Sequence, residues 1–372
     1  MNPASNKRIL FLFSQNDIGG HTKFVLNFIK ILNTENIHSE VYVPWFTHYF
    51  YTLNYRRKNK PNDVLIWIRY FLGQIKLQLK VSKFAWRGNH LGITPVKLSR
   101  YLFSPKRKKL DLFDVIITTG HFQLQELIKL DVNMQKIIYI IHHLHTNNIE
   151  DIGVDLISPK VKIAVSSMRT AIECNKLGIK DIAIIRLGVD HEVFYPKKHL
   201  KNKRDIQIGF FYYEHARKNP RLIETVISEL QQRTPLPIRL HVFGNGFRKN
   251  RSGISVYENL TEEMYANKIA SLDLFVYISQ LEGFGLPPLE AMASGVCVIS
   301  NDVGAVSEFL IDKKNGKLLP INTSADNWVK EIVYLINDKA TREKYAKQGL
   351  EDSKNWPWSS TYNAYLKLIV NS

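Results

Sequence analysis

Residues 281–295 read LEGFGLPPLEAMASG, a turn rich in glycine and proline that is followed by a short helical pattern. The residues before it, LDLFVYIS at 272–279, predict a strand, because such a continuous apolar run is typical of parallel strands covered on both faces. Pro287 and Pro288 fit a helix start, where a missing N–H group costs nothing, and we expect this helix over 287–294. Strand, turn and helix in this order form the repeating unit of an α/β fold.

The same alternation runs along the chain in two series, which a polar segment at 188–205 separates. We expect strands at 8–13, 39–43, 114–119, 136–141, 162–166 and 181–187 in the first series, and at 205–213, 238–244, 254–258, 272–279 and 295–300 in the second. Two such series predict two doubly wound, Rossmann-like domains facing a central cleft, with ligands at the carboxyl ends of the strands.

Length and composition agree with this division. A chain of 372 residues is too long for one ordinary core. No apolar run approaches the roughly 20 residues that span a bilayer, and the apolar run at 9–13 is too short for a signal peptide, so we expect a cytoplasmic protein. Cys174 and Cys297 lie in apolar patterns and are expected in the core, with no disulfide framework.

The positive charge is concentrated in one segment. The net charge is +17, of which residues 51–110 contribute +14, with aromatic residues interleaved. This asymmetry predicts a local anionic partner. Three interpretations stay open for the segment: a solvated insertion whose aromatic residues join the first core, a membrane-binding surface, or a nucleic-acid-binding surface. We favour a membrane or an anionic acceptor, and the cluster at 104–110, SPKRKKL, is expected at the surface.

The turn at 281–295 has the chemistry of an anion site. A helix N-terminus presents unpaired amides and about half a positive charge, which suits a diphosphate. Gly283 and Gly285 allow the backbone to approach that anion closely. Glu290, expected in the first helical turn, is placed to bind ribose hydroxyls, and Glu282 to face a sugar beyond the phosphates.

Residues 279–320 resemble the retaining glycosyltransferases of the GT-B fold, specifically family 4, whose hallmark is two glutamates in an EGFGLPxLEAMA context. Weaker resemblances are DIGGHTKFVLNF to the N-terminal glycine loop, IIRLGVDHEVFYP to the interdomain segment, and NWPWSSTYNAYLKLI to a final helix that crosses back. The resemblance implies an N-terminal acceptor domain at 1–187 with the insertion 51–110, a nucleotide-sugar domain at 188–355, and a crossing helix at 356–372.

The resemblance also implies roles for single residues. Glu290 is expected to bind the nucleotide ribose, Glu282 to hold sugar hydroxyls, and Lys218 to neutralise the departing diphosphate. The remaining expected donor-binding or catalytic residues are Gly19, Gly20, His142, Arg217, Gly283, Phe284, Gly285 and Leu286.

Two positions depart from the family pattern. Tyr213 stands where the family usually has an arginine, five residues before the lysine, and Arg217 is the candidate replacement. Ala305 stands where a second glycine is usual. No Asp-x-Asp triplet occurs, so we expect no metal and no cofactor. A metal site in HHLHTN at 142–147 is not favoured, because adjacent histidines on a strand point to opposite faces.

The sequence therefore predicts a metal-independent, retaining transferase that moves a sugar from a nucleotide-sugar donor to a saccharide or lipid-linked acceptor in surface polysaccharide or glycan biosynthesis. We expect it in the cytoplasm, with a peripheral position at the inner face of the membrane. The alternative is a catalytically silent protein of the same fold that binds a nucleotide sugar, which Tyr213 suggests. Nucleic acid is not an expected partner.

Overall fold

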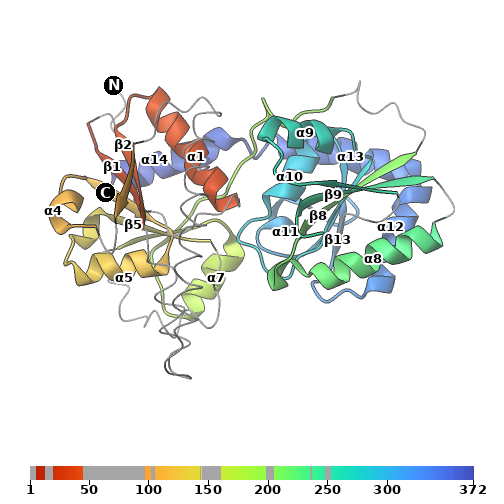
Figure 1. The fold of residues 1–372 in the computed structure, drawn as a ribbon, viewed down its shortest axis with the longest axis horizontal. Helices are drawn as coiled ribbons and strands as arrows, with labels where there is room; N and C mark the ends of the chain where they lie inside the picture. Colours follow the sequence, from red (N-terminus) through yellow and green to blue (C-terminus); the bar gives the residue numbers. More distant parts are fainter. Residues whose placement is uncertain are drawn as a thin grey trace, which may run out of the picture. The chain divides into compact units, whose positions relative to one another are not determined.

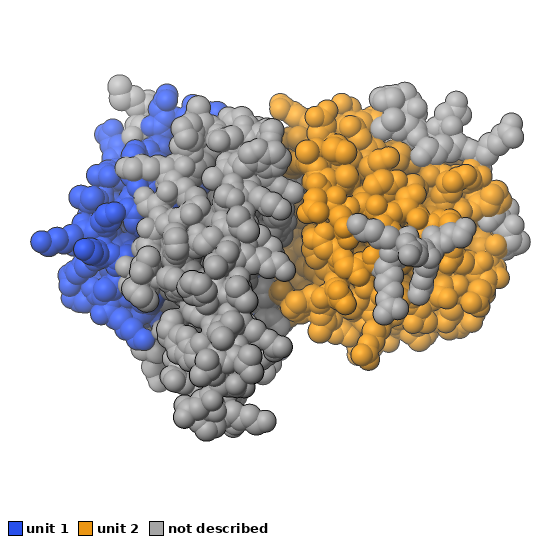
Figure 2. All heavy atoms as spheres, viewed as in Figure 1, with its two compact units in different colours: residues 1–165, 173–184, 362–372 blue, residues 166–172, 185–361 orange. Residues whose placement is uncertain are grey.

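The computed structural model describes residues 6–12, 20–44, 97–101, 105–142, 144, 161–197, 205–234, 237–247 and 253–372. The chain divides into two compact units, which Figure 2 colours separately. Unit 1 comprises residues 1–165, 173–184 and 362–372, and unit 2 comprises residues 166–172 and 185–361.

Unit 1 is built on a seven-stranded parallel sheet in the order β3-β2-β1-β4-β5-β6-β7 (Figure 1). The strands are β1 Ile9–Leu12, β2 Ser39–Pro44, β3 Lys97–Tyr101, β4 Val115–Thr118, β5 Ile137–Ile141, β6 Lys162–Val165 and β7 Ile182–Ile184. The helices that carry its residues are α1 Gly20–Thr34, α4 Arg107–Leu110, α5 His121–Lys129, α7 Met168–Lys176 and α14 Trp358–Val370, of which α7 and α14 also contribute residues to unit 2.

Unit 2 is built on a six-stranded parallel sheet in the order β10-β9-β8-β11-β12-β13. The strands are β8 Ile206–Tyr213, β9 Ile238–Asn245, β10 Ile254–Tyr257, β11 Leu274–Tyr277, β12 Cys297–Asn301 and β13 Lys317–Leu319. The helices are the 3-10 turn η3 Ala216–Lys218, then α8 Pro220–Arg233, α9 Glu262–Ala270, α10 Leu286–Ala293, α11 Val306–Phe309, α12 Ala325–Asn337 and α13 Lys339–Ser353.

The core of unit 2 follows from the alternation of side chains along its strands. Ile208, Phe210 and Tyr212 of β8 point to one face and join a buried cluster with Val226 of α8 and Trp328 of α12. Helices α8 and α12 therefore cover this face of the sheet (Figure 1). Both faces are covered, which explains why the strands read as continuous apolar runs.

The expected doubly wound α/β architecture is confirmed, and every strand predicted from an apolar run has a counterpart among the described residues. Two strands were missed. Strand β3, KLSRY, lies inside the basic segment and pairs with β2 at the edge of the sheet, so that part of the segment belongs to the sheet and is not a solvated insertion. Strand β13, KLL, was missed because it offers only two consecutive apolar residues. Cys174 and Cys297 are both buried, as expected.

The order of the strands defines a switch point in each sheet. In unit 2 the chain moves outward from β8 to β10 and then returns to place β11 on the other side of β8. In unit 1 the corresponding point lies between β1 and β4. The loops that leave the carboxyl ends of two such strands diverge to opposite faces, which leaves a crevice where ligands bind in open α/β sheets. In unit 2 this is the edge beyond β8 and β11.

Two segments of unit 2 form a short parallel bridge. Val189 N–H donates to Trp356 O at 2.8 Å, and Trp358 N–H donates to Val189 O at 3.0 Å. Gly188 lies against this bridge so closely that a Cβ atom would be 2.4 Å from the backbone carbonyl of Pro357. Only glycine allows the two backbones to approach this closely.

Gly188→Ala is therefore expected to lower the free energy of unfolding by about 1–3 kcal/mol, because the added methyl group forces two backbones apart. Urea denaturation measures the change. Ser360→Ala, an exposed position close to the same bridge, is the control and is expected to change stability by less than about 0.5 kcal/mol. Equal stability of Gly188→Ala and the wild type would contradict the steric argument.

Candidate functional site

Three loops of unit 2 meet at the carboxyl edge of the sheet. They follow β8, β11 and β12, which are neighbouring parallel strands, so their loops leave the sheet at the same edge. The first loop carries Lys218, the second carries Glu282, and the third carries Gly304. The two residues expected to bind sugar and diphosphate thus come from the two strands that flank the switch point.

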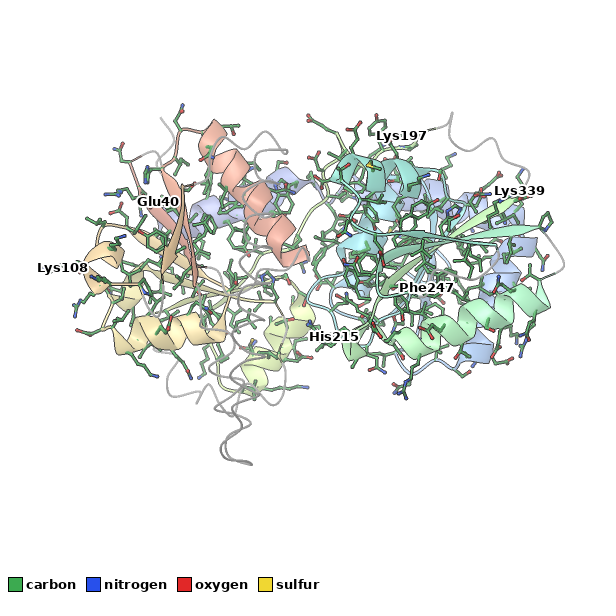
Figure 3. The ribbon with its side chains drawn as sticks, in the orientation of Figure 1. Glu40, Lys108, Lys197, His215, Phe247 and Lys339 are labelled. Atoms are coloured by element: carbon green, nitrogen blue, oxygen red, sulfur yellow. The ribbon has the colours of Figure 1, made fainter. Side chains whose placement is uncertain are left out.

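A tight turn presents Lys218. His215 caps η3 by accepting a hydrogen bond from Arg217 N–H at 3.2 Å through its Nδ1 atom. Burial lowers the pKa of His215, and the adjacent charges of Arg217 and Lys218 lower it further, so the imidazole is neutral near pH 7 and its Nδ1 atom accepts. Asn219 then adopts a left-handed conformation, φ 48°, and Pro220 starts α8. Figure 3 labels His215 at this edge of unit 2.

The carbonyl oxygen of Arg217 ties the first loop to the second. It accepts hydrogen bonds from Gln280 N–H at 2.7 Å and Leu281 N–H at 3.3 Å, and Ser279 Oγ lies 3.0 Å from it. Asn301, at the end of β12, binds both backbone groups of Ser279: its Oδ1 accepts from Ser279 N–H at 3.1 Å, and its amide donates to Ser279 O. The residues before Glu282 are therefore fixed from both neighbouring strands.

The Lys218 ammonium and the Glu282 carboxylate form an ion pair, with both side chains mostly buried. Ser279 Oγ lies 2.6 Å from Glu282 Oε1, closer than to the Arg217 carbonyl, so its single proton is assigned to Glu282. Lys218 Nζ is also 3.4 Å from the Tyr277 hydroxyl and 5.4 Å from the centroid of the Phe211 ring. Lys218, on η3, and Ser279, in the loop after β11, thus fix the position of Glu282.

Tyr277 completes this network. Burial raises the pKa of its hydroxyl well above the usual range, and the Glu282 carboxylate, which is both a nearby negative charge and a hydrogen-bond partner, raises it further. The hydroxyl therefore stays protonated and donates to Glu282. An ionised carboxylate accepts about four hydrogen bonds. With Lys218, Ser279 and Tyr277 as donors, Glu282 keeps capacity for a further donor such as a sugar hydroxyl.

The start of α10 differs from the expectation by one residue. The helix begins at Leu286, because Gly285 takes φ 104° as its N-cap, and the two prolines occupy the second and third helical positions. Glu290 is therefore the fifth residue, in the second turn, and the expectation of a first-turn position was wrong. Since Glu290 is also only 4% exposed, it is not a solvated residue that merely complements the helix dipole.

The prolines also limit the number of donors at this helix start. Pro287 and Pro288 have no N–H group, so Gly285 and Leu286 supply the backbone donors there. Of the two glycines expected to need backbone freedom, only Gly285 has a positive φ among the described residues. A Cβ atom at Gly285 would lie 2.6 Å from Val306 Cγ2, so the space for a side chain is also missing.

The third loop supports the second one. Gly304 has φ 57°, and a Cβ atom there would lie 2.8 Å from Phe284 O and 2.9 Å from Glu282 Cβ. The next residue, Ala305, is fully buried and donates its N–H to Phe284 O at 2.8 Å. The alanine at position 305 therefore fits where the family usually has a second glycine. At position 304, by contrast, there is no space for a side chain.

The other expected residues of unit 2 lie at the same edge. Tyr213 is the last residue of β8, and its ring packs against Phe211 with centroids 5.3 Å apart. Gly283 lies in the second loop, and its carbonyl accepts a hydrogen bond from Ser166 Oγ at 3.3 Å. Whether Arg217 replaces the arginine absent at Tyr213 stays a prediction.

The expected residues of unit 1 are placed only in part. Gly20 is the first residue of α1, and Gly19 lies outside the described residues. His142 directly follows β5 and is half-buried. The first residue of α5, His121, follows β4 at the switch point of unit 1 and was not singled out from the sequence.

Known proteins resemble the part of the chain that carries the candidate site. Residues 193–352 match the family Glycosyl transferases group 1. This match contains β8–β13 and all three loops of the candidate site. The chain is 28% identical over 195 residues to a D-inositol 3-phosphate glycosyltransferase of Pseudarthrobacter chlorophenolicus, which covers 47% of this chain and 46% of that protein.

A second relative is the O-antigen chain mannosyltransferase B of Escherichia coli, 35% identical over 100 residues, 26% of each chain. The chain thus spans about half the length, or less, of these curated relatives. Among solved structures, Anabaena HepE in complex with UDP and glucose superposes with a TM-score of 0.73 at 12% identity, covering 98% of this chain and 99% of that one. This likeness confirms the expected GT-B fold.

Gly285→Ala is expected to lower the free energy of unfolding by about 2–4 kcal/mol, through left-handed strain and the contact with Val306. It should also weaken binding of a nucleoside diphosphate at least about tenfold, because the start of α10 has to move. Gly295→Ala, at the other end of α10 with φ 69°, is the matched control: it should cost about 1–2 kcal/mol and leave binding unchanged. Denaturation and calorimetric titration measure both. Equal binding by the two variants would contradict the assignment.

Proposed function

We propose that this protein is a retaining, metal-independent glycosyltransferase of family 4, which transfers a sugar from a nucleotide-sugar donor to a saccharide or lipid-linked acceptor. One observation carries the proposal: Lys218 and Glu282 form a mostly buried ion pair at the switch point of unit 2, and Glu290 lies further along the helix that starts beside them. These residue types suit a diphosphate, a sugar and a ribose: Lys218 comes from the loop after β8, Glu282 from the loop after β11, and Glu290 from α10.

Lys218 is the group proposed to stabilise the leaving diphosphate. In transfer from a nucleotide sugar, negative charge grows on the diphosphate while the sugar becomes oxocarbenium-like. A preorganised donor aimed at such charge contributes about 3 kcal/mol or more to the rate. The ammonium group is held in place by Glu282 and by the rings of Phe211 and Tyr277, so it needs no reorganisation when charge develops.

Glu282 is proposed to bind sugar hydroxyls and not to attack the sugar. Its carboxylate is engaged by Lys218, Ser279 and Tyr277, which lowers its reactivity as a nucleophile while fixing its orientation. Retention then proceeds by attack of the acceptor on the face that the diphosphate leaves. The anomeric configuration of the product, read by NMR, tests retention directly.

Unit 1 is proposed to provide the acceptor side. Under this proposal residues 1–187 bind the acceptor, residues 188–355 bind the donor, and residues 356–372 return to the first domain. Gly19 and Gly20 are proposed to contact the donor phosphates, and His142 to contact the reacting sugar. The likeness of part of the chain to an O-antigen mannosyltransferase supports a role in surface polysaccharide assembly.

Glu290→Ala should abolish release of nucleoside diphosphate from the donor sugar, because the ribose loses its acceptor pair. The donor is first found by a thermal-shift screen over UDP-, GDP-, ADP- and dTDP-sugars, and release is then measured with and without acceptor. Lys218→Ala should lower kcat by about 10²–10³-fold. Glu263→Ala, an exposed acid of α9, is the control and should behave as wild type.

Two outcomes contradict the proposal in different ways. Release by Glu290→Ala at the wild-type rate would remove the assigned site. Binding of a donor without release or transfer by the wild type would favour the alternative, a catalytically silent protein that binds nucleotide sugars, for which Tyr213 in place of the family arginine is the reason.

We also propose a peripheral membrane position at the inner face of the membrane, through the basic segment 51–110. Among the described residues, Lys106, Arg107, Lys108 and Lys109 are exposed around α4, as expected, and Leu112 beside them is 54% exposed. Arg107 is paired with Asp131 at 3.1 Å. No described helix is long and apolar enough to cross a membrane. Basic residues with an exposed leucine suit an anionic lipid surface.

Neutralising residues 106–109 should reduce recovery with anionic liposomes in a flotation assay, since each basic side chain near such a surface contributes about 1 kcal/mol. Neither the wild type nor the neutralised variant should float with liposomes of zwitterionic lipid. Neutralising four exposed lysines of unit 2, Lys339, Lys344, Lys347 and Lys354, is the charge-matched control; Figure 3 labels Lys108 and Lys339. Equal losses in the two variants would show that only net charge matters and would contradict a specific surface.

A further inference from the structure

One tyrosine of unit 2 has a hydroxyl group that the proposed mechanism does not use. Tyr265 belongs to α9, and its hydroxyl oxygen is buried and has no hydrogen-bond partner among the residues that the structure describes. Tyr212 and Tyr277, two other buried tyrosines of the same unit, both have partners: Tyr212 donates to Glu224 at 2.6 Å, and Tyr277 bonds to Glu282.

Packing does not explain why this residue is a tyrosine. Its ring lies edge-on against Phe243, with centroids 5.6 Å apart, and against Phe194 at 6.1 Å. A phenylalanine would make the same ring contacts. Because a buried hydroxyl without a partner destabilises a fold, packing alone favours phenylalanine here. The hydroxyl of Tyr265 therefore calls for a partner that engages it in another state of the protein.

The neighbours of Tyr265 indicate that partner. Helix α9 packs against α10, the helix that carries Glu290. Burial raises the pKa of Tyr265 well above the usual range, and the nearby charge of Glu290 raises it further, with a smaller contribution from Tyr213. Electrostatic interactions with Glu290 and Tyr265 also raise the pKa of Tyr277, so the three side chains lie near one another. The hydroxyl of Tyr265 thus stays protonated, beside a buried carboxylate that can accept from it.

We propose that Tyr265 is a positioning residue for Glu290: its hydroxyl donates a hydrogen bond to the Glu290 carboxylate when that carboxylate turns to accept two hydroxyl groups of the donor ribose. This inference rests on the proposed function. A carboxylate accepts about four hydrogen bonds, so it can accept from two ribose hydroxyls and one phenol at the same time. The phenol fixes the carboxylate in the orientation that the ribose needs, and the donor restores the partner that the buried hydroxyl lacks among the described residues.

The test compares Tyr265→Phe with Tyr212→Phe, which each remove one oxygen atom. Tyr265→Phe should unfold at the same temperature as wild type or a higher one, because it removes a buried group without a partner. It should bind the donor about tenfold more weakly, with KM raised and kcat unchanged, because ribose binding is equal in ground and transition states. Tyr212→Phe should show the reverse: a lower unfolding temperature and unchanged donor affinity, since its bond to Glu224 is structural.

Titration with the donor found in the thermal-shift screen, alongside Glu290→Ala, distinguishes the possible failures. Wild-type affinity in Tyr265→Phe together with weak binding by Glu290→Ala would overturn this inference and leave the proposed function in place. A lower unfolding temperature in Tyr265→Phe, equal to that of Tyr212→Phe, would assign the hydroxyl a structural role and would also overturn it. Equal donor affinity in Glu290→Ala and wild type would overturn both proposals.

Discussion

The carbonyl oxygen of Arg217 holds the candidate site together. It accepts hydrogen bonds from the backbone of Gln280 and Leu281, so the loop after β8 and the loop after β11 are joined directly. Without this connection the ammonium of Lys218 and the carboxylate of Glu282 would belong to two independent loops. The parallel register of β8 and β11 brings the two loops to the same edge of the sheet, at its switch point.

The charged groups of the site are thereby held in place by a small number of protein contacts. Three protein groups orient Glu282, while Gly304 and Ala305 support the turn from the other side. A buried ion pair of this kind adds little net stability, since desolvation offsets much of the attraction. Its value lies in geometry: the pair presents a cation and an acceptor at fixed positions, which the proposed function assigns to the diphosphate and to the sugar.

Much of the fold was predictable because buried parallel strands have continuous apolar sequences. Edge strand β3, KLSRY, has no such pattern and was missed for that reason. The two glutamates were found because both lie in the contiguous motif at 281–295, and Lys218 was found through a shorter resemblance. The sequence did not reveal the roles of Ser279, Tyr277, Tyr265 and Gly304, because their contacts with the motif depend on which loops and helices the sheet brings together. Helix α10 starts one residue earlier than predicted because Gly285 adopts a left-handed conformation as its N-cap. The prediction had placed the start at Pro287, where a proline is favourable.

The two prolines at the start of α10 have a consequence for selectivity. A helix start with few N–H groups, next to a lysine already neutralised by its own carboxylate, has weak attraction for small free anions. Inorganic phosphate or sulfate would gain a single cation and lose its hydration. Under the proposed function, a nucleotide sugar also brings hydroxyl groups for both glutamates, so the site would favour the whole molecule over the abundant small ions.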